Sequence, residues 1–283
     1  MVEIILKELM QFLRIQVCFY VFFLLACNPE KSRELGGEQI VYDVFPVLGQ
    51  SNAYNGFQLD AELDKPNELI FQLGRFGVND LKIILAKEPL EHHIPAVDCN
   101  GFAMTFAKLY LQYFWQLNHR VLLIPCAENA SSFRLNHWNK GDTLYNDAVN
   151  RLKYVLDKYP GSKVKAFLWH QGESDVYWGR NYAGMLDRMI MNMRRDIGVQ
   201  NGDSIPFIVG GFVPFWADQR RDRRILDSVI KETPERVIGT GYADPRFPFV
   251  ITKPDNKVDE IHFDAAGQRE MGKRYFESYQ KLN

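Results

Sequence analysis

The sequence predicts an α/β fold in which a mainly parallel sheet lies between two layers of helices. Apolar runs of strand length recur along the chain and alternate with stretches of helical periodicity, which is the pattern of strands connected by crossover helices. The first run, Val41 to Leu48, is apolar on both faces apart from Asp43, as in a parallel strand that helices cover on each side. The expected strands are residues 39–48, 120–125, 164–169, 206–213 and 236–242.

Residues 1–27 resemble a bacterial lipoprotein signal and are expected to lie outside this fold. The apolar run 17–26 follows Arg14 and ends directly before Cys27. It is too short to cross a bilayer of about 30 Å as a helix, and the proline and polar residues that follow disfavour a buried N-terminal helix. We expect cleavage before Cys27 and acylation of its thiol, which would anchor the protein to the bacterial cell envelope through lipid alone. Translation is expected to begin at Met10, because the preceding residues would make the signal's first part long and acidic.

The rest of the chain is expected to form one domain. Residues 28–38 are polar and contain glycine, as in a tether, and no Pro/Gly/Ser-rich linker, repeat or low-complexity segment interrupts residues 39–283. A hydrophobic content of 46% is ample for a core. The formal charge of −1 gives no electrostatic reason to expect a nucleic acid partner.

Cysteine and histidine usage gives no sign of a metal site. Of the four cysteines, Cys18 and Cys27 lie in the expected signal. An envelope location would permit a disulfide between Cys99 and Cys126, but two buried thiols are the expected state. The doublet His92-His93 lies close to two prolines, which indicates a surface loop. Because neither a Cys-x-x-Cys pair nor a His-Glu-x-x-His helix is present, we expect no metal and no cofactor.

Apolar residues recur at helical spacing between the strands. Phe102, Phe106, Leu109 and Tyr113 follow one another at intervals of four, three and four, which predicts the buried face of a helix. Comparable stripes predict helices at 145–156 and 182–197, and an amphipathic helix ends the chain.

Two segments are less regular. In residues 55–95 only a short strand at 81–86 is expected, and the remainder is read as an excursion from the sheet. The aromatic residues at 212–216 follow a strand, so they either pack in the core or line a pocket.

The first strand runs into the turn Gly49-Gln50-Ser51-Asn52. Gly49 permits a tight turn, and Ser51 is then expected at the carboxyl edge of the sheet, where open α/β folds bind their ligands. The alternative is a serine that caps the next helix.

Two further stretches place polar residues at the same edge. The strand that begins at Ala166 ends in a polar turn containing Gln171 and Glu173, and the carboxyl edges of neighbouring parallel strands converge on one crevice. Asp259 lies three residues before His262, just ahead of the terminal helix. Its carboxylate can accept the Nδ1 proton of His262, which leaves Nε2 free to take a proton from Ser51.

These stretches carry a family resemblance. The motifs Gly49-Gln-Ser-Asn52, Trp169-His-Gln-Gly-Glu-Ser-Asp175 and Asp259-x-x-His262 resemble those of the SGNH-type hydrolases. They are most similar to the sialate O-acetylesterase domain and to the acetylxylan esterases of carbohydrate esterase family six. The resemblance extends from about Val41 to the terminal helix. It implies a flavodoxin-like α/β/α sandwich and a serine esterase that removes O-acetyl groups from carbohydrate, either an acetylated polysaccharide or sialic acid.

The resemblance also implies roles for single residues. Ser51 would be the nucleophile and His262 the base, with Asp259 as the acid that orients it and Glu173 as the alternative acid. The oxyanion would be held by the N–H groups of Ser51 and Gly101 and by the Gln171 side chain.

Two other functions remain open at this point. The same residues would suit a lipase or thioesterase of other ester specificity. A non-catalytic glycan-binding protein is suggested by Trp138, Trp178 and Trp216, if these side chains are exposed. Arg134 and Arg180 follow strand ends and are either partners for a substrate carboxylate or solvated side chains.

Overall fold

The structure is a computed structural model that describes residues 40–255 and 258–283. The predicted signal, the acylated Cys27 and the tether fall outside the described residues and stay predictions. In the part of the chain that is described, no helix is both long and apolar enough to span a membrane.

One sheet forms the centre of residues 40–283. Its strand order is β10-β9-β8-β1-β6-β3-β4, and β7 also pairs with β1. All pairs are parallel except that between β3 and β4. The strands of this sheet are β1 (Val41–Gly49), β3 (Ile70–Leu73), β4 (Ile83–Leu85), β6 (His119–Pro125), β7 (Lys163–Val164), β8 (Phe167–His170), β9 (Phe207–Gly210) and β10 (Thr240–Ala243). The strands β2 (Gly56–Phe57) and β5 (Cys99–Asn100) form a separate antiparallel pair.

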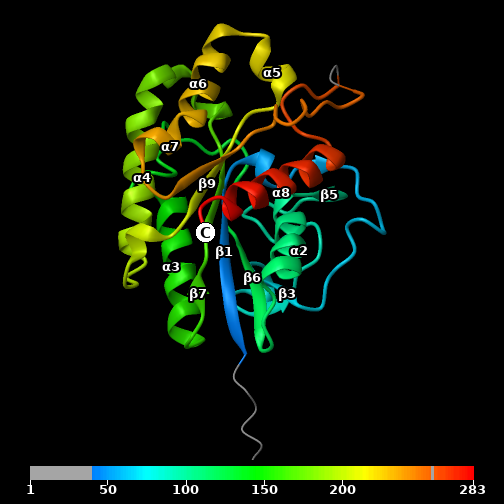
Figure 1. Cartoon of the computed structure of the whole chain (residues 1–283), viewed down its shortest axis with the longest axis vertical. Coiled ribbons are helices and arrows are strands. Elements are labelled where there is room, and N and C mark those ends of the chain that lie inside the picture. Colours follow the sequence, from blue (N-terminus) through cyan, green and yellow to red (C-terminus); the bar gives the residue numbers. More distant parts are fainter. Residues whose placement is uncertain (1–39, 256–257) are drawn as a thin grey trace, which may run out of the picture. The chain divides into compact units, whose positions relative to one another are not determined.

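Helices cover both faces of the sheet (Figure 1). The helices α2 and α8 pack against each other on one face, whereas α3, α4, α6 and α7 lie on the other. The predicted three-layer α/β/α sandwich is therefore confirmed. The helices are α2 (Phe102–Phe114), α3 (Thr143–Lys158), α4 (Tyr182–Asp196), α5 (Pro214–Asp218), α6 (Arg221–Lys231), α7 (Thr233–Arg236) and α8 (Ala265–Gln280), with 3-10 turns η1 (Ser51–Ala53), η2 (Gly77–Asn79), η3 (Glu173–Asn181) and η4 (Gly202–Ser204).

Aromatic packing fixes β1 against the layer of α2 and α8. Phe45 is fully buried and meets the rings of Phe106 and Tyr110 edge to face at centroid distances of 5.0 and 4.8 Å. Phe102 stacks on Tyr275 of α8 at 4.0 Å. Tyr113 was expected in this buried face but is 61% exposed, because it lies at the edge of the helix contact.

Asp43, the one charged residue in the apolar run of β1, is buried and has polar partners. Its Oδ2 accepts a hydrogen bond from the Tyr110 hydroxyl at 2.9 Å and lies 3.3 Å from Nδ1 of His119. A buried carboxylate is tolerated only with such partners. These contacts join β1 to α2 and to the start of β6.

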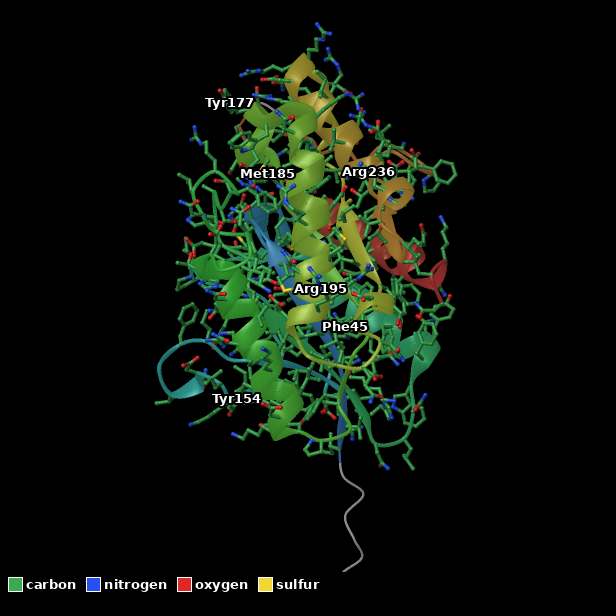
Figure 2. All side chains as sticks on the ribbon, turned by 90° about the vertical axis from the view of Figure 1, so that its left-hand side faces the viewer. Phe45, Tyr154, Tyr177, Met185, Arg195 and Arg236 are labelled. Atoms are coloured by element: carbon green, nitrogen blue, oxygen red, sulfur yellow. The ribbon has the colours of Figure 1, made fainter. Side chains whose placement is uncertain are left out.

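The predicted strands and helices are present, with corrected ends, except that the strand expected at 164–169 is divided into β7 and β8. The strand expected at 236–242 begins at Thr240, because Arg236 belongs to α7. In the irregular segment 55–95 the short strand is confirmed as β4, but β3 was missed. Only four residues long, β3 contains the polar Gln72, whose Oε1 accepts the Glu91 N–H at 2.8 Å. Figure 2 shows α4 at full length, with Met185 near its beginning and Arg195 near its end.

Candidate active site

Backbone geometry at the end of β1 presents Ser51. Gly49 has φ +117, and a Cβ at this position would collide with the carbonyl group of His170 in β8. The Gln50 N–H donates to the same carbonyl at 2.8 Å. The turn η1 has no side-chain cap, so the serine hydroxyl is not used as a helix cap.

Ser51, His262 and Asp259 lie in one line of contacts. Ser51 Oγ is 2.9 Å from His262 Nε2. On the other side of the ring, His262 Nδ1 is 3.0 Å from Asp259 Oδ2 and 3.2 Å from Oδ1. The fold thus brings together a hydroxyl and an imidazole that are 211 residues apart.

Asp259 is held in its ionised form. Burial raises the pKa of its carboxyl, but the charge of His262 and the hydrogen bonds from that residue outweigh this effect and lower the pKa. The backbone N–H groups of Ile261 and His262 also donate to Oδ1, at 3.2 and 3.1 Å. A carboxylate that accepts from both the ring and the backbone fixes the orientation of the imidazole.

The structure does not place Glu173, the alternative acid, against His262. Its Oε1 accepts from Nδ2 of Asn52 at 2.5 Å and lies 4.0 Å from His170 Nε2. Burial raises the pKa of Glu173 to about 7. Asp259 is therefore the carboxylate that contacts the imidazole.

Asn52 connects Glu173 to the loop that carries His262. Its Nδ2 also donates to the Ile261 carbonyl at 2.9 Å, and its Oδ1 accepts the Phe263 N–H at 3.1 Å. These bonds hold the backbone on both sides of His262. No role was predicted for Asn52, although its position directly after Ser51 indicated that it faces the same site.

The predicted oxyanion role of Gln171 is not supported by its contacts. The side chain is fully buried, and its amide hydrogens go to the Ser131 carbonyl at 3.1 Å and to Asp175 Oδ2 at 2.9 Å. Its Oε1 accepts from the Tyr182 hydroxyl at 2.8 Å. Because both hydrogens of the Gln171 amide are used in these bonds, the side chain connects the loops around the site and has no free donor for an oxyanion at Ser51.

The predicted oxyanion role of Gly101 is likewise not supported. Its N–H donates to the Glu88 carboxylate at 3.0 Å. A Cβ at this position would collide with the Ala53 carbonyl, so the glycine allows the start of α2 to approach the serine turn. The Ser51 N–H, in contrast, donates to none of the residues that the structure describes.

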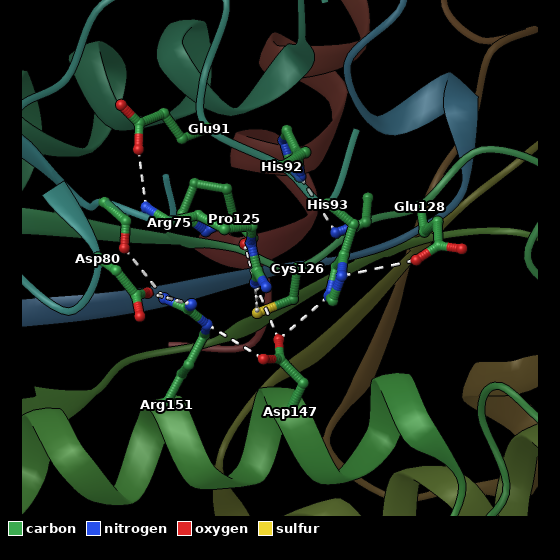
Figure 3. A network of polar contacts seen from close by, with 12 residues as sticks. Arg75, Asp80, Glu91, His92, His93, Pro125, Cys126, Glu128, Asp147 and Arg151 are labelled. Atoms are coloured by element: carbon green, nitrogen blue, oxygen red, sulfur yellow. Dashed lines mark hydrogen bonds and ion pairs between the residues drawn. The ribbon is translucent and has the colours of Figure 1, made fainter. Parts of the chain in front are cut away.

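A polar network, shown in Figure 3, supports the loop after β6. Arg75 donates to Asp147 Oδ2 at 2.8 Å and lies 3.6 Å from the Cys126 sulfur. His93 bridges Asp147, at 3.1 Å, and Glu128, at 3.5 Å. The Glu128 N–H in turn donates to the Gly49 carbonyl at 3.0 Å. The network thus ties this loop to the serine turn.

The histidine doublet is not a surface loop, contrary to the prediction. His92 is fully buried, stacks on Tyr54 at 4.4 Å, and accepts the Ala127 N–H on Nδ1 at 3.1 Å. Both described cysteines are free thiols; Cys126 is buried as expected, whereas Cys99 is half-buried. Burial raises the pKa of Cys126 to about 12. No group of three or more metal-ligating side chains occurs within residues 40–255 and 258–283.

The tryptophans do not form an exposed platform. Trp138 is fully buried and donates to the Ser131 hydroxyl at 2.9 Å, and Trp216 is 6% exposed. Trp178 is half-buried. In the segment 212–216, most side chains pack inward, and only Phe215 is substantially exposed.

Sequence comparisons find relatives among carbohydrate esterases. The family model described as "Carbohydrate esterase, sialic acid-specific acetylesterase" matches residues 41–281. A probable carbohydrate esterase of Arabidopsis thaliana is 32% identical over 148 residues, which cover 50% of this chain and 53% of the plant protein. A probable 9-O-acetyl-N-acetylneuraminic acid deacetylase of Escherichia coli K12 is 26% identical over 227 residues, covering 62% of this chain and 69% of that protein. The match thus spans about half the length of the plant relative.

Solved structures share the fold. The crystal structure of NanS has a TM-score of 0.72 at 20% identity and covers 86% of this chain and 98% of its own. That of a carbohydrate acetylesterase from Xanthomonas citri has a TM-score of 0.60 at 18% identity, with 85% and 56% covered. At these identities the likeness shows the architecture.

Proposed function

The chain belongs to the family of sialic acid-specific acetylesterases among the carbohydrate esterases, which are carboxylic ester hydrolases, and from this premise we propose that it removes O-acetyl groups from a carbohydrate through an acyl-enzyme on Ser51. The observation that carries the proposal is the 2.9 Å contact between Ser51 Oγ and His262 Nε2, with Asp259 on the opposite side of the ring. A hydroxyl in contact with an oriented imidazole is the arrangement that activates a serine nucleophile.

In the proposed acylation, His262 Nε2 takes the Ser51 proton while Oγ attacks the acetyl carbonyl. Asp259 stabilises the imidazolium that forms. His262 then gives the proton to the departing sugar oxygen as the tetrahedral intermediate collapses, which leaves acetyl-Ser51. In the second half, His262 takes a proton from water, the hydroxide attacks the acyl group, and acetate leaves as Ser51 recovers its proton.

The Ser51 N–H is the oxyanion donor in this proposal. It lies on the residue that carries the nucleophile, and none of the residues that the structure describes accepts its hydrogen bond. A backbone donor held by a short turn needs no rearrangement when negative charge develops on the carbonyl oxygen.

Replacing Ser51 by alanine tests the proposal. We expect the Ser51→Ala variant to release no acetate from p-nitrophenyl acetate or from O-acetylated sugars, because the acyl-enzyme cannot form. A fluorophosphonate probe should label the wild-type protein at Ser51. The matched control is Ser228→Ala, whose hydroxyl lies on α6 and, among the described residues, bonds only to the Arg224 carbonyl. Undiminished turnover by Ser51→Ala would overturn the proposal.

A substrate panel separates the remaining ester specificities. Acetate or acid release would be compared among acetylated xylan, O-acetylated sialic acid, acetylated pectin, long-chain acyl esters and thioesters. Preference for the acetylated sugars supports a carbohydrate O-acetylesterase, whereas preference for long acyl chains or thioesters favours a lipase or thioesterase. An unlabelled, inactive protein that still binds glycan would instead be a non-catalytic binding protein.

A further inference from the structure

A buried lysine contacts the loop that carries His262, and the proposed reaction does not use it. Lys253 lies in the segment between β10 and α8, and its side chain is only 9% exposed. Lysine is rarely buried, because removing an ammonium group from water costs free energy that paired charges and hydrogen bonds must offset. The partners of this ammonium group therefore explain why the fold places a lysine here.

The local sequence holds the backbone of Lys253 in place. Pro254 follows it, and a proline restricts the preceding residue to extended backbone. Two residues earlier, Ile251 is buried, and its N–H donates to the Pro245 carbonyl at 2.8 Å. The lysine thus leaves the chain from a fixed point, which limits the positions that its ammonium group can reach.

The Lys253 ammonium contacts the acid and the base of the proposed reaction. Its Nζ donates to the backbone carbonyl of His262 at 2.5 Å and lies 3.8 Å from Oδ1 of Asp259. The same Oδ1 accepts the His262 N–H at 3.1 Å, while Oδ2 lies 3.0 Å from Nδ1 of the imidazole. One cation therefore acts on both members of the Asp259–His262 pair.

The contact with Lys253 completes the support of the His262 backbone. Asn52 bonds to the peptide groups that flank this residue, and Asp259 accepts its N–H. The His262 carbonyl is the remaining backbone polar group of the residue, and it accepts from Lys253. A shift of about 1 Å in a reacting group can cost about a hundredfold in rate. The bond from Lys253 therefore bears on where the imidazole lies.

The charges that face Lys253 are acidic. Asp255, Asp259 and Asp264 attract the ammonium and oppose the effect of burial, which lowers the pKa of Lys253. In return, the charge of Lys253 helps to lower the pKa of Asp259. Among the described residues, the ion pairs of Asp259 are those with Lys253 and His262.

The other groups around the histidine loop do not take over this role. Glu260 interacts with the charge of Arg223 from α6. Glu173 of η3 contacts Asn52. Residues 57–58, which line the same cavity as Lys253, are uncharged.

We propose that Lys253 is a positioning residue for the esterase reaction: its ammonium holds the backbone of His262 and disfavours protonation of the Asp259–His262 pair, so that the imidazole remains a base at lower pH. The proposal rests on the esterase function proposed above and adds a residue to it. A nearby positive charge favours the deprotonated form of a titrating group, and two groups in contact titrate as one coupled system.

The test is the pH dependence of kcat/KM for p-nitrophenyl acetate, a neutral ester. In Lys253→Met we expect the midpoint of the acid limb to rise by about 0.5 to 1 pH unit, because the lysine no longer repels the proton. On the plateau above this limb we expect kcat to fall by about 10- to 100-fold, because the imidazole loses a backbone anchor. KM should change by less than about threefold, since the substrate loses no contact.

Two further variants separate the charge from the hydrogen bond. Lys253→Arg keeps both, so its midpoint should stay within about 0.3 pH unit of the wild type and most of kcat should return. Lys253→Gln keeps a donor but no charge, so its midpoint should rise as in Lys253→Met. These two variants decide the question if Lys253→Met fails to fold, which thermal unfolding detects.

The matched control is Lys140→Met. Lys140 also pairs with an aspartate, Asp196 at the end of α4, at 2.8 Å. Because this pair is not among the contacts of the histidine loop, the variant should keep the wild-type pH profile and kcat.

The outcomes separate this proposal from the proposed function. An acid limb that neither Lys253→Met nor Lys253→Gln moves would overturn the role of Lys253 and leave the esterase intact, even if Tm falls, because a merely structural lysine does not shift this midpoint. A loss confined to KM would overturn it as well. A wild-type protein that hydrolyses neither p-nitrophenyl acetate nor O-acetylated sugars would overturn the proposed function.

A measurement without substrate tests Lys253 independently of activity. The ring signals of His262 can be followed by NMR through a pH titration and assigned with His262→Gln. We expect their midpoint to rise by about 0.5 to 1 pH unit in Lys253→Met, as in the kinetic profile. The same midpoint in the wild type and in Lys253→Met would overturn the proposal.

Discussion

The two carboxylates near His262 differ in what they touch, and this decides which one should matter for the reaction. Asp259 contacts the imidazole at 3.0 Å, whereas Glu173 contacts Asn52. We expect Asp259→Asn to lower kcat on p-nitrophenyl acetate by about 10²- to 10⁴-fold, because an amide cannot hold the required tautomer.

Glu173→Gln is the matched comparison. Its amide oxygen can still accept from Asn52, so kcat should stay within about tenfold of the wild type. Steady-state kinetics on both variants, with circular dichroism as a check on folding, measure the difference. The reverse order of losses would make Glu173 the functional acid.

At the scale of single residues, the contacts of His262 with Ser51 and with Asp259 were predicted, whereas the partners of single hydrogen-bond donors were not. Asp259 and His262 are three residues apart, so a short turn alone can bring them into contact. The direction of a donor such as the Gly101 N–H depends on Glu88, and that of the Gln171 amide depends on Ser131. Such partners cannot be read from a motif, and for this reason the contacts of Gly101 and Gln171 do not support their predicted oxyanion roles.

Among the elements, the junction of β8 with η3 depends on Gln171. This side chain satisfies the Ser131 carbonyl, Asp175 and the Tyr182 hydroxyl, all in a buried setting. Gln171→Ala would leave the Ser131 carbonyl unpaired, whereas Asp175 Oδ2 keeps the Phe133 N–H and the Tyr182 hydroxyl keeps the backbone carbonyl of residue 171. We expect a cost of about 2 kcal/mol, or roughly 4 to 8 °C in Tm for a domain of this size. Thermal unfolding measures it.

The control for this prediction is Gln112→Ala, at an exposed position of α2. That change should leave Tm within about 2 °C, because surface substitutions have small effects. If Gln171→Ala kept the wild-type Tm and lost about a hundredfold in kcat, the oxyanion role of Gln171 would be restored.

The sequence pattern predicted the long elements, whereas the short strands at the edge of the sheet are too short to show a pattern. The strands β1, β6, β8, β9 and β10 are buried between helices and appear as apolar runs. At the far edge, β3 and β4 have four and three residues, too few to show a period. Their pairing with β6 and with each other comes from tertiary contact.

For the molecule as a whole, buried titratable groups of opposite sign act on stability in the same pH range. Burial raises the pKa of Glu173 to about 7 and that of Asp227 to about 6. Both contributions are fully present below the unfolded pKa of about 4 and are lost as pH rises through the folded values. Burial lowers the pKa of His170 to about 3 and lowers that of His92 as well. Charging these two buried histidines costs stability as pH falls below about 6.5, so their contribution to the free energy of unfolding slopes in the opposite direction to that of Glu173 and Asp227 between pH 4.5 and 6.5.

Replacing Glu173 should reveal its contribution to the pH dependence of stability. Glu173→Gln eliminates a group that must ionise in a buried site, so its free energy of unfolding should rise relative to the wild type between pH 4.5 and 7, by at most about 3 kcal/mol. Urea unfolding at several pH values measures the difference. Glu62→Gln, whose side chain is 84% exposed, should give a curve parallel to the wild type. A parallel curve for Glu173→Gln as well would mean that Glu173 titrates normally, and that Asn52 and the protein dipoles around it compensate for its burial.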